Sequence, residues 1–237
     1  MSQSLVMNMV LPMLIASAQN QSASTEPQIT VTEEVRVLLN TRDEIGIDAM
    51  LDALDALGRK GDDSALELLG EIYAGAAFDY ERDSAKACSY FGRVTQVRPD
   101  TLHNLATCFY SGDGRPQDYT QARLLYKQAA ELGYAKAKCA YGNMLRKVIA
   151  KDAVEARKWF LAAAEQDHAN ASFVLAQIYW NGDGVDKNRD EAEKWWKISY
   201  QAGRKDASFH LGNANIAKMF IYTDDKITGV DLKKMQA

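Results

Sequence analysis

The stretch ASFVLAQIYWNGDGVDKNRDEAEKWWKISYQAG, residues 171–203, carries the pattern that decides the fold. Its first half places apolar side chains at helical spacing around Leu175 and Tyr179, and its second half does so around Ala192 and Trp195. Such spacing is typical of amphipathic helices that pack against neighbours. The glycines between the two halves supply the positive φ that a tight reversal requires. The stretch therefore predicts a pair of antiparallel helices.

The same pattern recurs along the chain with a period of about 36 residues, which indicates a repeat architecture. The apolar reference position of the first helix in each copy is occupied by Leu69, Leu105, Tyr141, Leu175 and Leu211. A Gly or Ala follows each of these residues, and a bulky pair such as Tyr90-Phe91 marks the second helix. The small residue allows close approach of two helices, and the bulky pair fills the space between layers. Four full helix pairs and one closing helix are predicted.

These residues resemble the Sel-1-like repeat family, a branch of the tetratricopeptide superfamily. The family pattern is matched most fully by residues 171–203 and by residues 102–130 with Gly133. The resemblance implies an all-α fold, a right-handed α-solenoid of antiparallel helix pairs that binds a protein partner. The first copy departs from the pattern at its turn, the third copy lacks the Gly-Asp-Gly turn, and Asp167 replaces an inter-repeat glycine.

The ends of the chain divide it further. Residues 5–16, LVMNMVLPMLIA, and the following A-x-A site predict a signal peptide over residues 1–18, although Met1–Ser4 holds no Lys or Arg. We expect the remaining segments as follows: a polar linker at 19–32, an N-terminal helical cap at 33–63, the repeats at 64–219 and a C-terminal tail at 220–237 that is irregular beyond Tyr222. The predicted location is periplasmic or secreted, and the alternative is a cytoplasmic protein whose leader is not cleaved.

Composition and charge exclude some classes of function. The 28 basic and 32 acidic side chains give a net charge of -4, so no excess of cations is present to bind nucleic acid. The apolar segment near the N-terminus is shorter than the roughly 20 residues of a membrane-spanning helix. Acidic residues exceed basic ones within residues 1–63, and we interpret this excess as a solvated helix face or, alternatively, as an interaction surface. We expect no nucleic-acid partner and no stable membrane span.

The sequence announces no catalytic, cofactor or metal site. It contains no H-E-x-x-H, G-x-S-x-G, S-x-x-K or P-loop motif, and its three histidines show no metal-ligand spacing. The three cysteines are expected to be small buried side chains, with at most one disulfide. Whether Cys88 and Cys108 approach each other is left open. We expect no cofactor and no catalytic residue.

A partner is expected to bind on the concave face, which the first helix of each pair lines in such solenoids. Taking Leu69 as reference, the free stripe lies at offsets of -2, +2 and +5. The candidate groove residues on this stripe are His103, Thr107, Tyr110, Asn143, Arg146, Phe173, Gln177, Trp180, Phe209 and Asn213. The amides would bond to a peptide backbone and the aromatic rings would anchor side chains. Alternatively, these rings pack between repeats or under the C-terminal tail.

The function predicted from this surface is that of a non-catalytic adaptor for a protein or peptide, in bacterial envelope regulation, signalling or secretion. The alternative is an envelope enzyme, or a cell-wall or β-lactam-binding protein of the same family. The cysteine-rich members that bind β-lactams carry regular cysteine pairs, which this sequence does not have.

Overall fold

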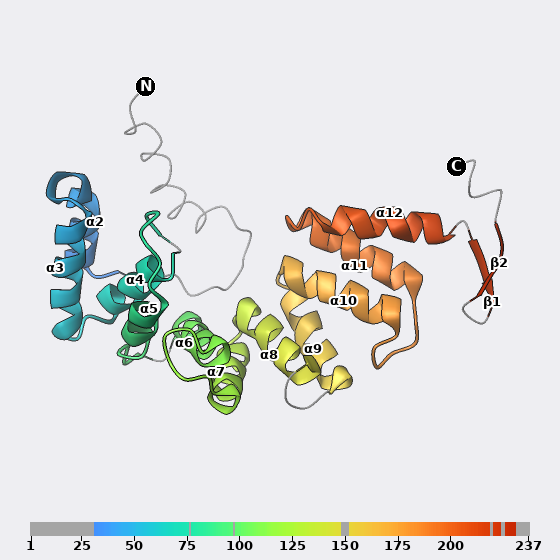
Figure 1. Cartoon of the computed structure of the whole chain (residues 1–237), viewed down its shortest axis with the longest axis horizontal. Coiled ribbons are helices and arrows are strands. Elements are labelled where there is room, and N and C mark those ends of the chain that lie inside the picture. The colour runs from blue at the N-terminus through green and yellow to red at the C-terminus, as the bar shows by residue number, and fades with distance from the viewer. Residues whose placement is uncertain are drawn as a thin grey trace, which may run out of the picture. The chain divides into compact units, whose positions relative to one another are not determined.

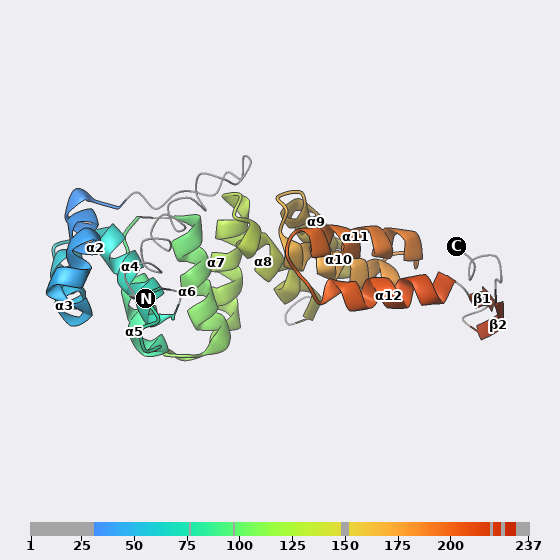
Figure 2. The ribbon, with the colours of Figure 1, turned by 90° about the horizontal axis from the view of Figure 1, so that it is seen from above.

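A computed structural model describes residues 31–75, 77–96, 98–147, 152–218, 220–223 and 226–230, with side chains described as far as Gly212. The signal peptide and most of the linker predicted from the sequence lie outside these residues. The chain forms two compact units, one ending at Leu125 and one beginning at Tyr126. Both units consist mainly of helices, and the second unit also contains a β-hairpin (Figures 1 and 2).

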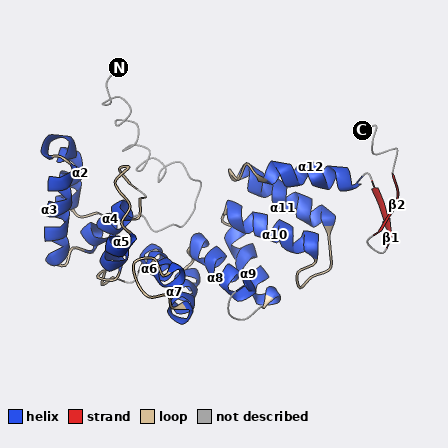
Figure 3. Cartoon of the chain, in the orientation of Figure 1, coloured by secondary structure: helices blue, strands red, loops and turns tan. Residues whose placement is uncertain are grey.

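The first unit is built from antiparallel neighbours (Figure 3). Its helices are α2 (Glu33–Ile45), α3 (Ile47–Arg59), α4 (Asp63–Tyr73), α5 (Ser84–Phe91) and α6 (Pro99–Ser111), and α7 (Tyr119–Glu131) crosses the boundary. The predicted cap corresponds to α2 and α3, which meet at Gly46 with φ of 83°. Met50 and Leu54 of α3 are fully buried in one apolar core with Leu69 of α4. The cap thus closes this core.

The second unit repeats the helix pair and ends in a hairpin. Its elements are α8 (Ala135–Lys147), α9 (Ala153–Ala164), α10 (Ala169–Asn181), α11 (Arg189–Gln201), α12 (Ala207–Lys218), β1 (Phe220–Thr223) and β2 (Lys226–Val230). The all-α class of antiparallel helix pairs is confirmed for the repeats. The irregular tail is a wrong expectation, because β1 and β2 pair antiparallel from Phe220 opposite Val230 to Thr223 opposite Lys226. Runs of β-branched and aromatic residues favour such pairing.

The turns follow the backbone demands of the repeat. Gly112 and Gly182 end α6 and α10 in the left-handed conformation, with φ of 71° and 80°. Asp167, which stands where other copies have glycine, adopts the same unusual conformation with φ of 57°. Because a Cβ atom disfavours this region, the turn between α9 and α10 is the strained member of its series.

Small residues on the first helices receive aromatic rings from the second helices, as predicted. A Cβ atom added to Gly70 would clash with the Phe91 ring, and one added to Gly142 would lie 3.0 Å from the Phe160 ring. Phe160 is fully buried. Glycine therefore sets the close approach of α4 to α5 and of α8 to α9.

A disulfide joins Cys88 of α5 to Cys108 of α6, with Cα atoms 5.8 Å apart. It links two successive repeats within the first unit and settles the pairing that the sequence left open. Cys139 is free and buried, and burial raises the pKa of its thiol to about 11. That thiol is therefore protonated at neutral pH, as expected of a small interior residue.

Candidate functional site

The candidate groove residues lie on four first helices, one in the first unit and three in the second. On α6, Thr107 is exposed and its hydroxyl donates to the carbonyl of His103 at 2.9 Å. His103 is partly exposed, and its Nδ1 lies 3.3 Å from the side-chain oxygen of Asn104. The Tyr110 side chain is 38% exposed and its ring meets that of Tyr119 edge to face at 5.6 Å. These three residues remain accessible on one helix.

On α8, the predicted residues are partly exposed and linked to their surroundings. The Asn143 amide lies 3.9 Å from the sulfur of Cys139 one turn earlier. The guanidinium of Arg146 forms an ion pair with Asp183 at 3.5 Å, and Asp183 belongs to the turn after α10. Arg146 therefore ties one helix pair to the next while keeping 17% of its side chain exposed.

On α10, Gln177 and Trp180 lie three residues apart and are both partly exposed. The Trp180 ring contacts the ring of Trp196, with centroids 5.3 Å apart. The guanidinium of Arg189 lies over the Trp180 ring, 5.3 Å from its centroid. A cation over an indole ring adds a favourable contact of about 0.5–1 kcal/mol at an exposed site. Packing thus holds Trp180 in place and leaves part of it open.

The expectation that Phe173 is accessible on the groove stripe is wrong, because this residue is only 6% exposed. The guanidinium of Arg204 lies 3.7 Å from the ring centroid, and the His210 ring meets it edge to face at 5.1 Å. Both partners come from the following repeat. The alternative interpretation, that such rings pack between repeats, is therefore correct for Phe173, and a side chain so covered offers little surface to a partner.

The last helix, α12, holds the other two predicted residues. Phe209 is 69% exposed, the highest value among the large apolar side chains of the described residues. The backbone of Asn213 belongs to α12, but its side chain lies outside the described residues. The amide series is thus represented in the described part by Asn143 and Gln177.

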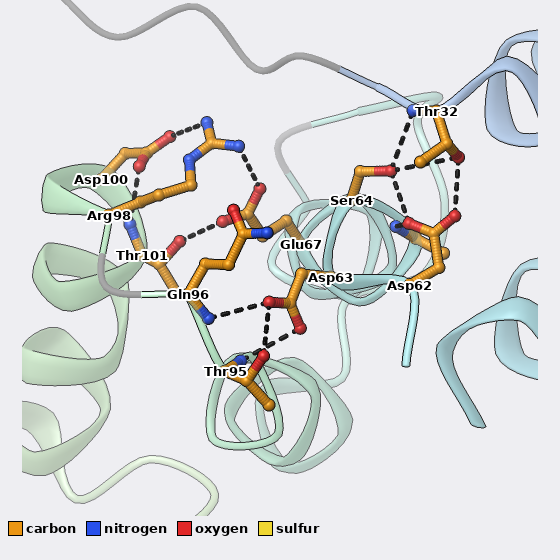
Figure 4. A network of polar contacts seen from close by, with 11 residues as sticks. Thr32, Asp62, Asp63, Ser64, Glu67, Thr95, Gln96, Arg98, Asp100 and Thr101 are labelled. Carbon is orange, nitrogen blue, oxygen red and sulfur yellow. Dashed lines mark hydrogen bonds and ion pairs between the residues drawn. The ribbon is translucent and has the colours of Figure 1, made fainter. Parts of the chain in front are cut away.

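A buried polar network between α4 and α6 was not foreseen from the sequence (Figure 4). Glu67 is 3% exposed, accepts a hydrogen bond from the Thr101 hydroxyl and pairs with Arg98 at 2.8 Å. Burial raises the pKa of Glu67, although Thr101 and Arg98 act in the opposite direction. Its only signal in the sequence is a carboxylate at the register position that Phe173 occupies in the fourth repeat.

Asp63, at the start of α4, extends this network toward the loop after α5 (Figure 4). It accepts hydrogen bonds from the backbone of Thr95 at 3.0 Å and of Gln96 at 2.8 Å, and from the Thr95 hydroxyl at 2.8 Å. Burial alone would raise the pKa of Asp63, but these donors outweigh it and hold the pKa below its ordinary value. The network joins successive repeats and is structural.

A polar hollow of about 700 Å³ lies in the first unit beside the start of α5. Four of its charged side chains form ion pairs with one another: Arg82 pairs with Asp113 at 2.9 Å, and Lys86 with Asp83 at 3.8 Å. No group of three metal-binding side chains is found in the part of the chain that the structure describes. Within the same residues, no helix is both long and apolar enough to cross a bilayer.

Comparison with known proteins identifies the repeats. Residues 99–134, 136–168 and 169–203 are three Sel1 repeats, each of which contains one helix pair from α6 to α11. This confirms the resemblance for these residues, whereas α2–α5 and α12 lie outside the three matched stretches. Sel1 repeats mediate protein interactions.

Two curated fungal proteins share part of the sequence. Chitin synthase regulatory factor 3 of Schizosaccharomyces pombe is 34% identical over 93 residues, which cover 37% of this chain and 10% of that protein. Chitin synthase regulator SKT5 of Saccharomyces cerevisiae is 36% identical over 89 residues, which cover 37% of this chain and 12% of that protein. The chain thus spans about a tenth of the length of these relatives.

A solved structure shares the fold. The Sel1 repeat protein from Oxalobacter formigenes aligns with a TM-score of 0.68 at 23% identity, over 78% of this chain and 55% of that one. At this identity the likeness bears on the fold alone.

Proposed function

We propose that this chain, which contains three Sel1 repeats, is a non-catalytic adaptor that binds an extended segment of a protein partner on the first helices of its second unit. The observation that carries the proposal is the partly exposed set formed by Asn143, Arg146, Gln177 and Trp180 on α8 and α10. Amide side chains both donate and accept hydrogen bonds, as a peptide backbone requires. Trp and Arg are the residue types that most often dominate binding at interfaces.

The contacts around this set support a preformed surface. Trp180 is held by the Trp196 ring, and Arg146 is held by Asp183. Side chains that are already ordered lose less conformational entropy when a partner binds. Phe173 is not part of this surface, since it is buried between repeats.

The test uses purified full-length chain and an array of extended peptides. The double variant Asn143→Ala with Gln177→Ala removes two amides without opening the core, and Gln201→Ala, an exposed amide on α11, is the matched control. We expect the double variant to lose at least about tenfold in affinity for the selected peptides, measured by fluorescence polarisation, and the control to bind like the wild type. Unchanged binding by a folded double variant would contradict the assignment.

We further propose that the adaptor acts outside the cytoplasm, in a periplasm or beyond it. The leader-like residues 1–18 support this location, and so does the Cys88–Cys108 disulfide, since disulfides persist mainly in oxidising compartments. N-terminal sequencing of the protein from its native host tests the proposal. A mature chain that begins at Gln19 is expected, and a protein recovered with residues 1–18 intact and both cysteines reduced would refute it.

A further inference from the structure

The last helix of the repeat series leaves exposed a side chain whose equivalents are buried in three of the other copies and partly exposed, as His103, in the remaining one. Two residues before the apolar reference position, Glu67, Cys139 and Phe173 are each at most 6% exposed, whereas Phe209 is 69% exposed. Phe173 is covered by Arg204 and His210, which belong to the following repeat. Phe209 lies on α12, the last helix of the described chain, so no such repeat follows it there.

The surroundings of Gly212 on α12 also differ from those of the equivalent glycines in other copies. Gly70 and Gly142 face the rings of Phe91 and Phe160, but Gly212 at the equivalent position has no atom within 4 Å of an added Cβ. Among the residues that the structure describes, none covers this face of α12 at Gly212. Among the described side chains of α12, Phe209 is the large apolar residue that is exposed.

The opposite end of the repeat series presents an apolar groove. It lies between α2 and α3 in the first unit and has a volume of about 440 Å³. Its apolar lining consists of Val37, Leu38, Ala53, Ala56 and Leu57, and its charged lining consists of Glu33, Glu34 and Lys60. Val37 is 50% exposed, so the groove is accessible to another molecule.

We propose that a second copy of this chain occupies the groove, with Phe209 of one copy inserted between α2 and α3 of the next. The two segments of the sequence that carry these features also differ in net charge. Residues 33–63 hold nine acidic and four basic side chains, and residues 201–237 hold four acidic and six basic ones. Opposite net charges favour this head-to-tail contact and disfavour contacts between two like ends.

The proposed contact at Phe209 resembles the contact that buries Phe173 within one chain. Just as the next repeat covers Phe173, the cap of a second copy would cover Phe209, and the interface is heterologous because the two surfaces differ. Each surface can therefore be blocked without altering the other. The substitutions Phe209→Asp and Val37→Arg each introduce a charge at an exposed position, so both variants are expected to fold.

The experiment measures the mass of the full chain by sedimentation at rising concentration. We expect wild type to associate at concentrations up to the order of 100 μM, more weakly in 1 M than in 0.1 M salt, because salt screens the charge attraction. Each single variant is expected to associate at least about tenfold more weakly. An equimolar mixture of the two variants is expected to form dimers, because one intact groove meets one intact Phe209.

Two outcomes would overturn the proposal. One is a wild type that remains monomeric at these concentrations. The other is association that Phe209→Asp abolishes but Val37→Arg leaves unchanged, which indicates a symmetric contact between two α12 ends. Val154→Asp, at a 50% exposed apolar position of α9, is the matched control and is expected to associate like the wild type.

Discussion

The turn between α9 and α10 depends on the properties of single residues. Asp167 accepts a left-handed conformation that glycine holds elsewhere, and His168 follows it as the N-cap of α10. Nδ1 of His168 accepts a hydrogen bond from the backbone of Ala171 at 3.2 Å, which requires that nitrogen to be unprotonated. Burial lowers the pKa of His168, and the neighbouring charge of Lys136 lowers it further.

This arrangement predicts a loss of stability on acidification. The folded pKa of His168 lies below its ordinary value of 6.5, so the unfolded chain binds the proton first as the pH falls through 6.5. The stabilisation that neutral His168 contributes is therefore complete above pH 6.5. It declines as the pH falls from 6.5 toward the pKa of His168 in the folded protein. His168→Asn keeps a capping acceptor that does not titrate. We expect the variant to lose less stability than wild type between pH 7.5 and pH 5, measured by urea unfolding.

Comparing wild type with His168→Asn isolates the effect of His168 on stability. Other groups such as Glu67, whose pKa is raised, titrate equally in both proteins. Parallel stability curves for the variant and wild type would show that the cap does not titrate in this range.

Glu67 illustrates at the same scale what the residue pattern leaves undecided. Its position in the repeat is that of Phe173, and both residues are buried against the following repeat. Glu67 forms an ion pair with Arg98 and a hydrogen bond with Thr101. The ring of Phe173 packs against Arg204 and His210. The periodicity predicts the shared position, but the partner at each site depends on side chains about 34 residues later that only packing brings near.

At the scale of helices, glycine decides how closely a pair can pack. Gly70 faces the Phe91 ring, while Gly212 faces no atom within 4 Å. Both residues stand at the same position of the repeat, directly after Leu69 and Leu211. Their environments differ because α4 has a following helix, α5, and α12 is followed by a hairpin.

We therefore predict opposite effects for the same substitution. Gly70→Ala is expected to lower the free energy of unfolding by about 1–2 kcal/mol, because the overpacking cost exceeds the gain in helix propensity. Gly212→Ala is expected to raise the free energy of unfolding by about 0.5–1 kcal/mol, because alanine has the higher helix propensity. Chemical denaturation of both variants gives the comparison. Equal effects of one sign would contradict the role of Gly70 in helix packing.

At the scale of the whole molecule, each of the two units contains an apolar core, and the disulfide lies in the first unit. The Cys88–Cys108 bond closes a segment of 20 residues in the first unit. A cross-link of about this span contributes roughly 3 kcal/mol by restricting the unfolded chain. The free Cys139 of the second unit forms no such link.

Removal of the bond is thus expected to act on one unit more than the other. In the variant Cys88→Ala with Cys108→Ala, amide hydrogen exchange should accelerate in α4–α6 and change little in α8–α12. Cys139→Ala is the control and should leave exchange in α4–α6 unchanged. Acceleration of equal size in both units would instead show that they unfold together.

Helix pairs, turn glycines and a terminal cap were all predictable, because each follows from local spacing: apolar residues at 3.6-residue periodicity, glycines at positive φ and a recurring period of about 36 residues. The candidate surface was predictable as a set of helix positions, and Asn143, Gln177 and Trp180 remain partly exposed on it. Three features depended on tertiary structure: the burial of Phe173, the buried network around Glu67 and the pairing of Cys88 with Cys108. A repeat sequence specifies which residues are equivalent, but the exposure of each depends on whether another repeat follows to cover it.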